Sequence, residues 1–482
     1  MLGKRILAGV LALAMVLPLV ACGNEAEESS QSDKVTVPLD QFTTTSGDGE
    51  GGEEAAPPIS ALPDDAVKTL KWMANYDLNP AADADRSTSL VLFEDVCGGK
   101  IEWVQTSWAT QYTDLANAVL GNNAPDMFPY STMSFPMHVA AGFFQSIEDV
   151  VDFNDPLWSD MKETADQYVL NGEHYVAPIA SSASVIMAYN KDGIEEYGLE
   201  DPWELYQAGE WTWDKWVEIM EEWVSYSTEE APKFGVNGWY QPQLVQQTGK
   251  TMVNYVDGKF VQNLFDPDIE RVETLIYDLA KNGLNESNWY GNARNCFKSG
   301  KSLFYVMGAW ALTGTTNGPK EDSNWGICPM PSDPNNTSGQ KIASVDLTAY
   351  MWVNGSTSAD ALKMWYNCCR MAETDETYRE VSKQKFFADN PYWTEEMYEG
   401  MIASNSDEHL KIFDYAFGIS TVMSDETAGE NRYSVTKKLY EFVTQYDESG
   451  TQYTWTQVRD TYLPVVETEL ADLNAKIAAL QN

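Results

Sequence analysis

The most informative stretch for the architecture is residues 297–310, FKSGKSLFYVMGAW. It opens with a polar turn, continues through the apolar run Leu303–Met307, and closes with a Gly-Ala-Trp element ending at Trp310. A short apolar run bounded by turn residues is typical of a strand that is buried on both faces. We therefore predict a β-strand over this run, with a large aromatic side chain just beyond its end.

Similar apolar runs occur along the rest of the chain and alternate with segments of helical periodicity. This alternation predicts parallel sheets covered by helices, which is an α/β protein. Further strands are predicted at Leu70–Ala74, Ile101–Gln105, Val185–Tyr189, Trp325–Pro329 and Ala349–Val353. Helices are predicted at 112–120, at 213–224 with Thr212 as the N-cap, at 269–279, at 359–373, and from Pro464 onward.

The N-terminus has the three parts of a secretory signal: a short basic region, an apolar run from Ile6 to Val20, and small residues before Cys22. About 15 apolar residues are too few for the roughly 20 that a membrane-spanning helix requires. The four residues Leu19–Cys22 closely resemble the bacterial lipobox, whose cysteine receives a diacylglyceryl group before cleavage. We predict that residues 1–21 are a signal peptide and that lipidated Cys22 anchors the mature chain to the outside of the cell membrane.

Residues 22–65 contain eleven acidic side chains against the single Lys34, and few large apolar ones. Such a composition does not build a core, so this segment is predicted to be a disordered spacer between the anchor and the folded part. The spacer would supply location alone, and we expect ligand recognition to survive truncation before Ala66.

The remaining chain, about 415 residues, is too long for one hydrophobic core and predicts two lobes. The net charge of -42 argues against a nucleic-acid partner, because phosphate binding requires concentrated Lys and Arg. Five cysteines follow Cys22, an odd number without metal-type spacing, and the three histidines are far apart. Neither a disulfide scaffold nor a metal or other cofactor is predicted.

Common catalytic motifs are missing from the sequence. There is no GxSxG, no phosphate-binding Gly-rich loop and no HExxH, and histidine, the commonest general base, is scarce. With 73 acidic residues, any chosen pair of carboxylates is uninformative. We predict a protein that is not an enzyme, with a lipid-anchored glycoside hydrolase as the less favoured alternative.

A series of motifs, taken in order over residues 67 to 355, resembles the extracellular solute-binding proteins of carbohydrate-uptake ABC transporters, the class of maltose-binding protein. The series comprises a helix ending at Gly121 before Pro125-Asp126, then Gly142-Phe143-Phe144, Gly172 to Pro178, Tyr189-Asn190-Lys191-Asp192, Gly198-Leu199, Trp211 to Glu222, Phe297 to Lys301, Gly308-Ala309-Trp310, and Trp325-Gly326. Beyond Thr374 the resemblance is thin, and residues 383–413 look like a departure or an insertion.

The resemblance implies a two-lobed, periplasmic-binding-protein-like (Venus-flytrap) fold whose lobes are discontinuous in sequence and joined by hinge strands. The chain would cross between lobes near 180–184, near 343–347, and a third time after about Arg370. Lobe 1 would comprise residues 66–179 and 347–380, and lobe 2 residues 180–346 and 381–482.

The implied ligand lies in a cleft between the lobes. Pyranose rings present apolar faces and hydroxyl groups, which call for aromatic platforms and planar polar groups. By their position in the motifs, the aromatic candidates are Trp310, Tyr240, Trp239 and Tyr130, with core packing as the alternative role for each. Candidates at strand ends and crossovers that would face the cleft are Asn75, Tyr76, Asp77, Trp108, Ser181 and Asp346. Asp126 is expected to cap a turn, and Arg432 to form a surface ion pair.

We therefore predict a monomeric, lipid-anchored receptor that closes on a sugar or oligosaccharide and delivers it to the permease of an ABC transporter. A peptide, amino acid or polyamine remains an alternative ligand, because one architecture can serve several ligands.

Overall fold

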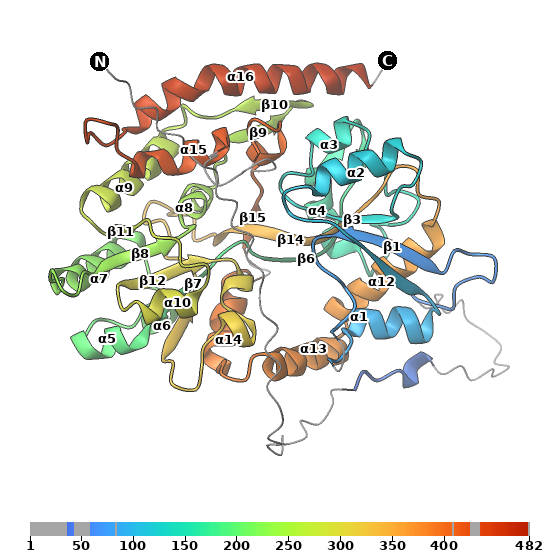
Figure 1. Ribbon diagram of the computed structural model, residues 1–482, viewed down its shortest axis with the longest axis horizontal. Helices are drawn as coiled ribbons and strands as arrows, with labels where there is room; N and C mark the ends of the chain where they lie inside the picture. Colours follow the sequence, from blue (N-terminus) through green and yellow to red (C-terminus); the bar gives the residue numbers. More distant parts are fainter. Residues whose placement is uncertain (1–35, 43–57, 82–83, 407–408, 425–433, 481–482) are drawn as a thin grey trace, which may run out of the picture. The chain divides into compact units, whose positions relative to one another are not determined.

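The computed structural model of this protein describes residues 36–42, 58–81, 84–406, 409–424 and 434–480. Two β-sheets with helices packed on them organise these residues (Figure 1). The first sheet has the order β15-β14-β3-β1-β2, with β6 paired to β14, and the second has the order β11-β8-β12-β7-β13. This arrangement confirms the predicted α/β class. The prediction of parallel sheets is wrong, because both sheets are mixed: β14 pairs antiparallel with β3 and β6, and β7 pairs antiparallel with β12 and β13.

The first sheet is formed by β1 (Thr69–Ala74), β2 (Lys100–Gln105), β3 (Met127–Pro129), β6 (Ala177–Ala183), β14 (Ile342–Trp352) and β15 (Leu410–Ile412). The second is formed by β7 (Ile186–Asn190), β8 (Phe234–Gly238), β11 (Asn285–Glu286), β12 (Ser302–Met307) and β13 (Trp325–Cys328). Two small hairpins pair β4 (Val169–Leu170) with β5 (Glu173–His174), and β9 (Val253–Val256) with β10 (Lys259–Gln262).

The helices are α1 (Thr88–Val91), α2 (Gln111–Leu120), α3 (Met137–Ala140), α4 (Lys162–Ala165), α5 (Lys191–Tyr197), α6 (Pro202–Ala208), α7 (Trp213–Ser225), α8 (Gln241–Gln247), α9 (Pro267–Lys281), α10 (Ala293–Lys298), α11 (Gly314–Asn317), α12 (Ala359–Thr374), α13 (Glu376–Asp389), α14 (Glu395–Ala403), α15 (Val435–Glu441) and α16 (Trp455–Ala479).

The predicted strand Leu303–Met307 is confirmed as β12, in the middle of the second sheet. All of its side chains are buried, because helices cover the sheet and β8 and β7 flank the strand. The other predicted strands are confirmed to within a few residues as β1, β2, β7 and β13. Only β14 is markedly longer than predicted, since it extends back to Ile342 through a half where exposed side chains interrupt the apolar run.

The predicted helices correspond to α2, α7, α9, α12 and α16. Thr212 caps α7 as expected, accepting a hydrogen bond from the Lys215 backbone N–H at 3.4 Å. The predicted start of the last helix at Pro464 is wrong. α16 begins at Trp455 after a capping box between Thr454 and Gln457, and it accommodates Pro464 on an exposed face.

β6 and β14 connect the two sheets, as Figure 1 shows near its centre. β6 pairs antiparallel with β14, with Ser181 opposite Leu347 and Ala183 opposite Val345. The two segments predicted to cross between lobes therefore pair with each other. Further along the chain, α12 packs on β1 and β6, whereas α14 packs on β13 of the second sheet. The lobe boundaries given above, including the one at 380/381, stay predictions.

The prediction of a disordered spacer through residue 65 is wrong at its end. Ile59 and Leu62 are only 1% and 5% exposed and belong to the core beside the first sheet. The Leu62 backbone N–H donates to the Cys97 carbonyl oxygen at 2.9 Å, and Asn367 Nδ2 donates to the Pro58 carbonyl oxygen at 2.7 Å. The end of the predicted spacer is therefore part of the folded protein, because its two apolar residues Ile59 and Leu62 are buried in the core.

A shorter piece of the predicted spacer also lies on the folded part. Val37, Leu39 and Phe42 pack against the same core, and the Tyr378 hydroxyl donates to the Pro38 carbonyl oxygen at 3.1 Å. The predicted signal peptide 1–21, lipidation at Cys22 and the role of Arg432 lie outside the described residues.

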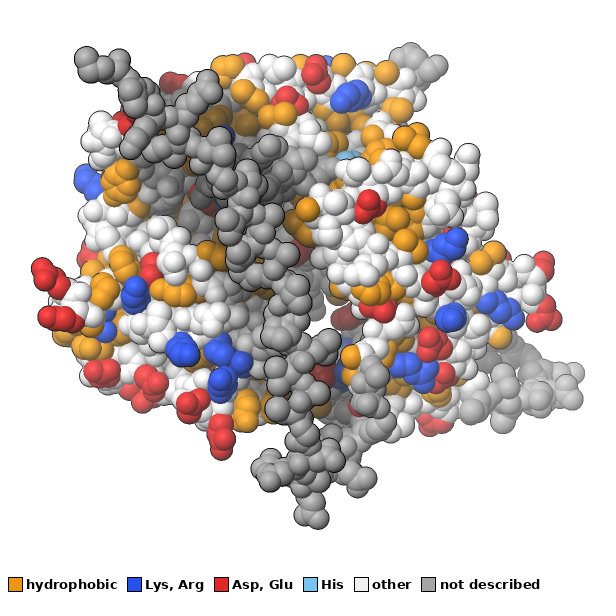
Figure 2. Space-filling view, viewed as in Figure 1, with side chains coloured by type: hydrophobic (Ala, Val, Ile, Leu, Met, Phe, Trp, Pro, Cys, Tyr) orange, Lys and Arg blue, Asp and Glu red, His pale blue; other side chains and the backbone are white. Residues whose placement is uncertain are grey.

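None of the helices in the described ranges has the length and apolar character needed to cross a bilayer. On the face drawn in Figure 2, Lys and Arg side chains are interspersed with Asp and Glu and form no continuous basic patch.

We predict that a chain beginning at Ala66 is less stable than one beginning at Pro58. Removing Ile59 and Leu62 from the core should cost about 3 to 6 kcal/mol, from roughly 1.5 to 3 kcal/mol for each buried side chain. Urea denaturation of the two truncated chains measures the difference. The matched control is the chain from Pro58 with Asp64 and Asp65 changed to Ser, which should keep its stability. Equal midpoints for the two truncated chains would contradict the docking of residues 58–62.

Candidate functional site

Three neighbouring parallel strands of the second sheet are each followed by a tryptophan. β11, β8 and β12 run parallel and lie in that order, and Trp289, Trp239 and Trp310 come just after their carboxyl ends. The ring centroids of Trp239 and Trp289 are 5.8 Å apart and nearly stacked, and those of Trp239 and Trp310 are 6.1 Å apart. We call these three side chains the Trp cluster.

The backbone around β8 explains why the Trp cluster forms. Gly238 ends β8 with φ 109°, and a Cβ there would lie 1.9 Å from the Val306 carbonyl oxygen, so the close approach of β8 to β12 requires glycine. That same oxygen accepts a hydrogen bond from the Trp239 N–H at 2.8 Å. On the other side, the Asn237 side chain donates to the carbonyl oxygens of Glu286 and Asn288, which holds the loop carrying Trp289 against β8.

The Trp cluster is unusual because it is exposed. Trp239, Trp289 and Trp310 are 40%, 60% and 52% exposed, and Trp108 is the fourth exposed tryptophan among the described residues. The chain has 17 tryptophans, and the rest are buried or half-buried. Large aromatic side chains gathered at a surface mark a binding site, because leaving them in water has a free-energy cost that a ligand can recover.

A second group of predicted residues follows the parallel strands of the first sheet. Tyr76 and Trp108, after β1 and β2, are about half exposed, and Tyr130 after β3 is half-buried with its hydroxyl donating to that of Tyr168 at 2.9 Å. Asn75 and Asp77 are exposed, and Asp77 accepts two hydrogen bonds from Asn79, at 2.9 and 2.8 Å. The carboxyl ends of parallel strands are the usual binding edge of α/β sheets.

Asp346 lies on β14, opposite Ser182 of β6, and completes this group. We call the group, which consists of Asn75, Tyr76, Asp77, Trp108, Tyr130 and Asp346, the Asp346 group. The side chain of Asp346 reaches solvent, yet burial by the surrounding protein raises its pKa, an effect that a hydrogen bond from the Leu347 N–H partly offsets. The pKa of Tyr76 is raised to about 12, first by burial and then by the negative charge of Asp346. Side chains that water reaches but protein largely surrounds are typical of a recess, and these two are close enough to interact.

Ser181 is half-buried on β6, and its hydroxyl oxygen accepts a hydrogen bond from Asn405 Nδ2 at 3.2 Å. Asp126 is buried and accepts from the Lys71 N–H at 2.7 Å and from the Ser356 hydroxyl at 2.6 Å. It ties β1 to two loops, in line with its expected structural role.

Tyr240 is not at the surface, so its prediction as a ligand contact is wrong. It is fully buried, its ring meets the Trp216 ring edge-on, and its hydroxyl donates to Asn285 Oδ1 at 2.8 Å. The chain turns after Gly238 so that Trp239 points outward and its neighbour points into the core beneath α8. Sequence alone left both roles open for these adjacent aromatic residues.

Trp289 is a site residue that the sequence did not predict. It follows β11, a two-residue strand that is too short to produce a detectable alternation of apolar and polar residues. The signal that could have found it is the pair Trp289-Tyr290 directly before Gly291, which is an aromatic pair in a turn-forming context like Trp239 beside Gly238.

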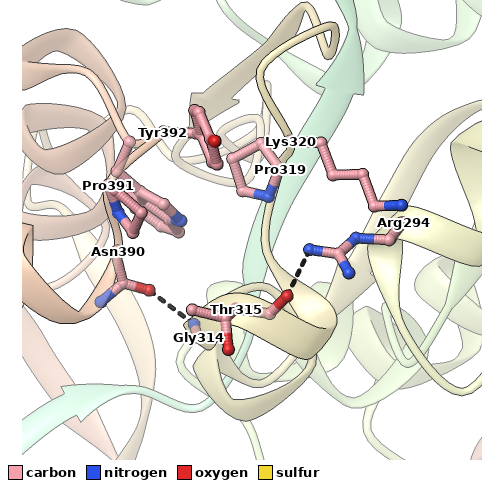
Figure 3. Close-up of a pocket in the computed structure, with 9 residues that line it drawn as sticks. Arg294, Gly314, Thr315, Pro319, Lys320, Asn390, Pro391 and Tyr392 are labelled. Atoms are coloured by element: carbon pink, nitrogen blue, oxygen red, sulfur yellow. Dashed lines mark hydrogen bonds between the residues drawn. The ribbon is translucent and has the colours of Figure 1, made fainter. Parts of the chain in front are cut away.

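A small cavity lies near the Trp310 element but contains none of the predicted residues (Figure 3). Its volume is about 80 Å³, and its lining includes Arg294, Lys320 and Tyr392. Arg294 donates to the carbonyl oxygens of Thr315 and Gly318, and Asn390 Oδ1 accepts from the Gly314 N–H. These groups hold the loops together, and the cavity is well below the roughly 300 Å³ of a ligand pocket. Within the described residues, no group of His, Cys, Asp and Glu could hold a metal ion.

The fold and the two groups of exposed residues define a two-lobed α/β binding protein. Residues 73–368 match the family model described as bacterial extracellular solute-binding protein, and this chain belongs to that family. A comparison with curated proteins found no match.

Solved structures of low identity share the fold. UgpB from Mycobacterium tuberculosis, in complex with glycerophosphocholine, is 15% identical with a TM-score of 0.59, covering 84% of this chain and 98% of its own. The GacH receptor of Streptomyces glaucescens, solved unliganded and with acarbose, is 17% identical with a TM-score of 0.56, covering 83% and 98%. A cyclo/maltodextrin-binding protein complexed with maltotetraose is 14% identical with a TM-score of 0.53, covering 86% and 97%. The predicted two-lobed fold is confirmed.

We predict effects of different size for the adjacent residues Trp239 and Tyr240. Tyr240→Ala should lower the free energy of unfolding by about 3 to 5 kcal/mol, because it empties a buried site. Trp239→Ala should lower it by only about 0.5 to 1.5 kcal/mol, because this partly exposed side chain loses its ring contacts with Trp289 and Trp310 and leaves no buried site empty. Chemical denaturation of the two variants measures both values. Similar losses in both variants would show that Trp239 is a packing residue too.

Proposed function

We propose that this protein captures a saccharide between the Trp cluster and the Asp346 group, and delivers it to the permease of an ABC transporter. The proposal rests on three exposed tryptophans that lie next to one another at the carboxyl ends of neighbouring parallel strands. Stacked sugar rings would cover these apolar faces, and the hydroxyl groups of the sugar would find acceptors in Asp346 and Asp77 and partners in Tyr76 and Asn75.

The length of the Trp cluster favours an oligosaccharide over a single sugar. Its two centroid separations, 5.8 and 6.1 Å, span more than one pyranose ring, so neighbouring rings of an extended ligand would each have an aromatic partner. The structural neighbours with acarbose and with maltotetraose support a ligand of this kind in the same fold.

In this proposal the protein binds the ligand without changing it chemically. The lobes close by bending at the β6–β14 pair and at the third crossing predicted after about Arg370, and the permease distinguishes the closed state from the open one. The signal peptide, the diacylglyceryl anchor on Cys22 and the monomeric state belong to the same proposal. They place the receptor outside the cell beside its permease.

A ligand with a quaternary ammonium group is the second candidate. Tryptophan faces attract cations, and Asp346 of β14 supplies an exposed carboxylate. UgpB shares the fold and was solved with glycerophosphocholine, which carries such a group.

We predict that calorimetric titration with mono- and oligosaccharides gives binding heat for at least one saccharide, and that Trp310→Ala and Trp289→Ala each weaken that binding about 5- to 150-fold. This range corresponds to about 1 to 3 kcal/mol of stacking energy. Tyr446→Ala is the matched control, because Tyr446 is equally exposed but lies outside both groups. It should leave the affinity unchanged.

Glycerophosphocholine is included in the same titration to test the second candidate. Heat from this compound and from no saccharide would overturn the sugar assignment while leaving the Trp cluster as the binding site. Unchanged affinity in both tryptophan variants would remove the Trp cluster from the site.

A further inference from the structure

Two buried cysteines from distant parts of the chain meet in the core beside the first sheet. Cys97 directly follows the short helix η2 (Leu92–Val96), and Cys368 lies on α12. Their sulfur atoms are 3.7 Å apart although the residues are separated by 271 positions. Because η2 packs on α12, the contact between the sulfurs is produced by the fold and not by local sequence.

The remaining cysteines lie in different settings. The Cys369 sulfur lies 4.0 Å from the Tyr350 hydroxyl, and Cys296 on α10 and Cys328 on β13 are buried in two different hydrophobic clusters. Within the described residues, no third side chain joins Cys97 and Cys368 to make a metal site. A pair of thiols in contact, without a metal, has one common chemistry, which is oxidation to a disulfide.

The compartment favours this oxidation. The family to which the chain belongs acts outside the cell, where disulfides form and persist. A disulfide bond is about 2.05 Å long, so the two sulfurs need to approach by less than about 2 Å. We propose that Cys97 and Cys368 are joined by a disulfide in the exported protein.

The contact between the two sulfurs makes Cys97 the more acidic thiol of the pair. The hydrogen bond from the Cys368 thiol lowers the pKa of Cys97, whereas burial raises the pKa of Cys368. The Cys97 thiolate attacks the disulfide of an oxidised thiol–disulfide oxidoreductase, which forms a mixed disulfide and releases one oxidant cysteine as a thiolate. Cys368 then loses its proton and displaces the second oxidant thiolate from Cys97. Two protein thiols become a disulfide, and the oxidant's disulfide becomes two thiols.

Residues 58–62 determine when the two thiols can react, because they cover both cysteines in the folded protein. Cys97 and Cys368 are 2% and 0% exposed. Residues 58–62 pack over this region, with Leu62 bonded to the Cys97 carbonyl oxygen and Asn367, next to Cys368, bonded to Pro58. A protein oxidant reaches the thiols before this segment docks. The finished bond then joins η2 to α12 and restricts the unfolded chain over a long loop.

The experiment refolds the full mature chain in a buffer of oxidised and reduced glutathione, blocks free thiols with N-ethylmaleimide, and maps the peptides by mass spectrometry without reduction. The expected result is one linked pair of peptides carrying Cys97 and Cys368. The oxidised protein should also melt about 5 °C above the protein kept in dithiothreitol, because the disulfide lowers the entropy of the unfolded state.

Variants separate this bond from general effects of oxidation. Cys97→Ser should abolish both the linked peptide and the dependence of the melting temperature on dithiothreitol. Cys296→Ser, the matched control at another buried cysteine, should keep both. Separate alkylated peptides for Cys97 and Cys368 after oxidative refolding would overturn the proposal, as would a bond from either cysteine to a different partner. The peptide map of the unchanged chain decides the question even if a variant fails to fold.

Discussion

The antiparallel pairing of β14 with β6 is the interaction on which the rest of the molecule depends. β14 belongs to the first sheet through β3, and β6 runs directly into β7 of the second sheet, so the chain passes between the two sheets at this pair. The register places Asp346 opposite Ser182, with its side chain in solvent beside Tyr76. A slip of one residue would turn Asp346 into the core and the apolar Leu347 outward. The alternation of buried and exposed positions in β14 therefore holds both the connection and the site in place.

Each of the two groups of exposed residues lies at the carboxyl ends of parallel strands, one group in each sheet. In each sheet three parallel strands lie side by side, and the residues after their carboxyl ends are gathered at one edge. In the second sheet these residues are the Trp cluster, and in the first they are tyrosine, tryptophan and polar side chains. An apolar platform and a polar, partly desolvated recess together match a ligand with apolar ring faces and many hydroxyl groups. Buried aromatic residues such as Trp216 of α7, whose ring meets that of Tyr240, fill the core next to Trp239.

The sequence predicted well those features that a single segment encodes. β12 was found from its apolar run, α7 from its spacing and its Thr212 cap, and Trp310 from its place after a buried strand. Prediction from the sequence failed where the position of a residue depends on partners that are distant in the chain. Tyr240 is buried because Asn285 and Trp216 receive it, Trp289 is brought to Trp239 by a two-residue strand, and Ile59 joins the core through contacts with α12. The contact between Cys97 and Cys368 belongs to the same class, since only the fold brings these residues together.

The central claim is that ligand is held between the Trp cluster and the Asp346 group, and a crystal structure of the protein with a saccharide that it binds tests this claim most directly. Sugar rings should stack on Trp310 and on Trp239 or Trp289, with hydroxyl groups within hydrogen-bond distance of Asp346. A saccharide bound elsewhere, for example at the small cavity beside Arg294, with the Trp cluster still open to solvent, would contradict it.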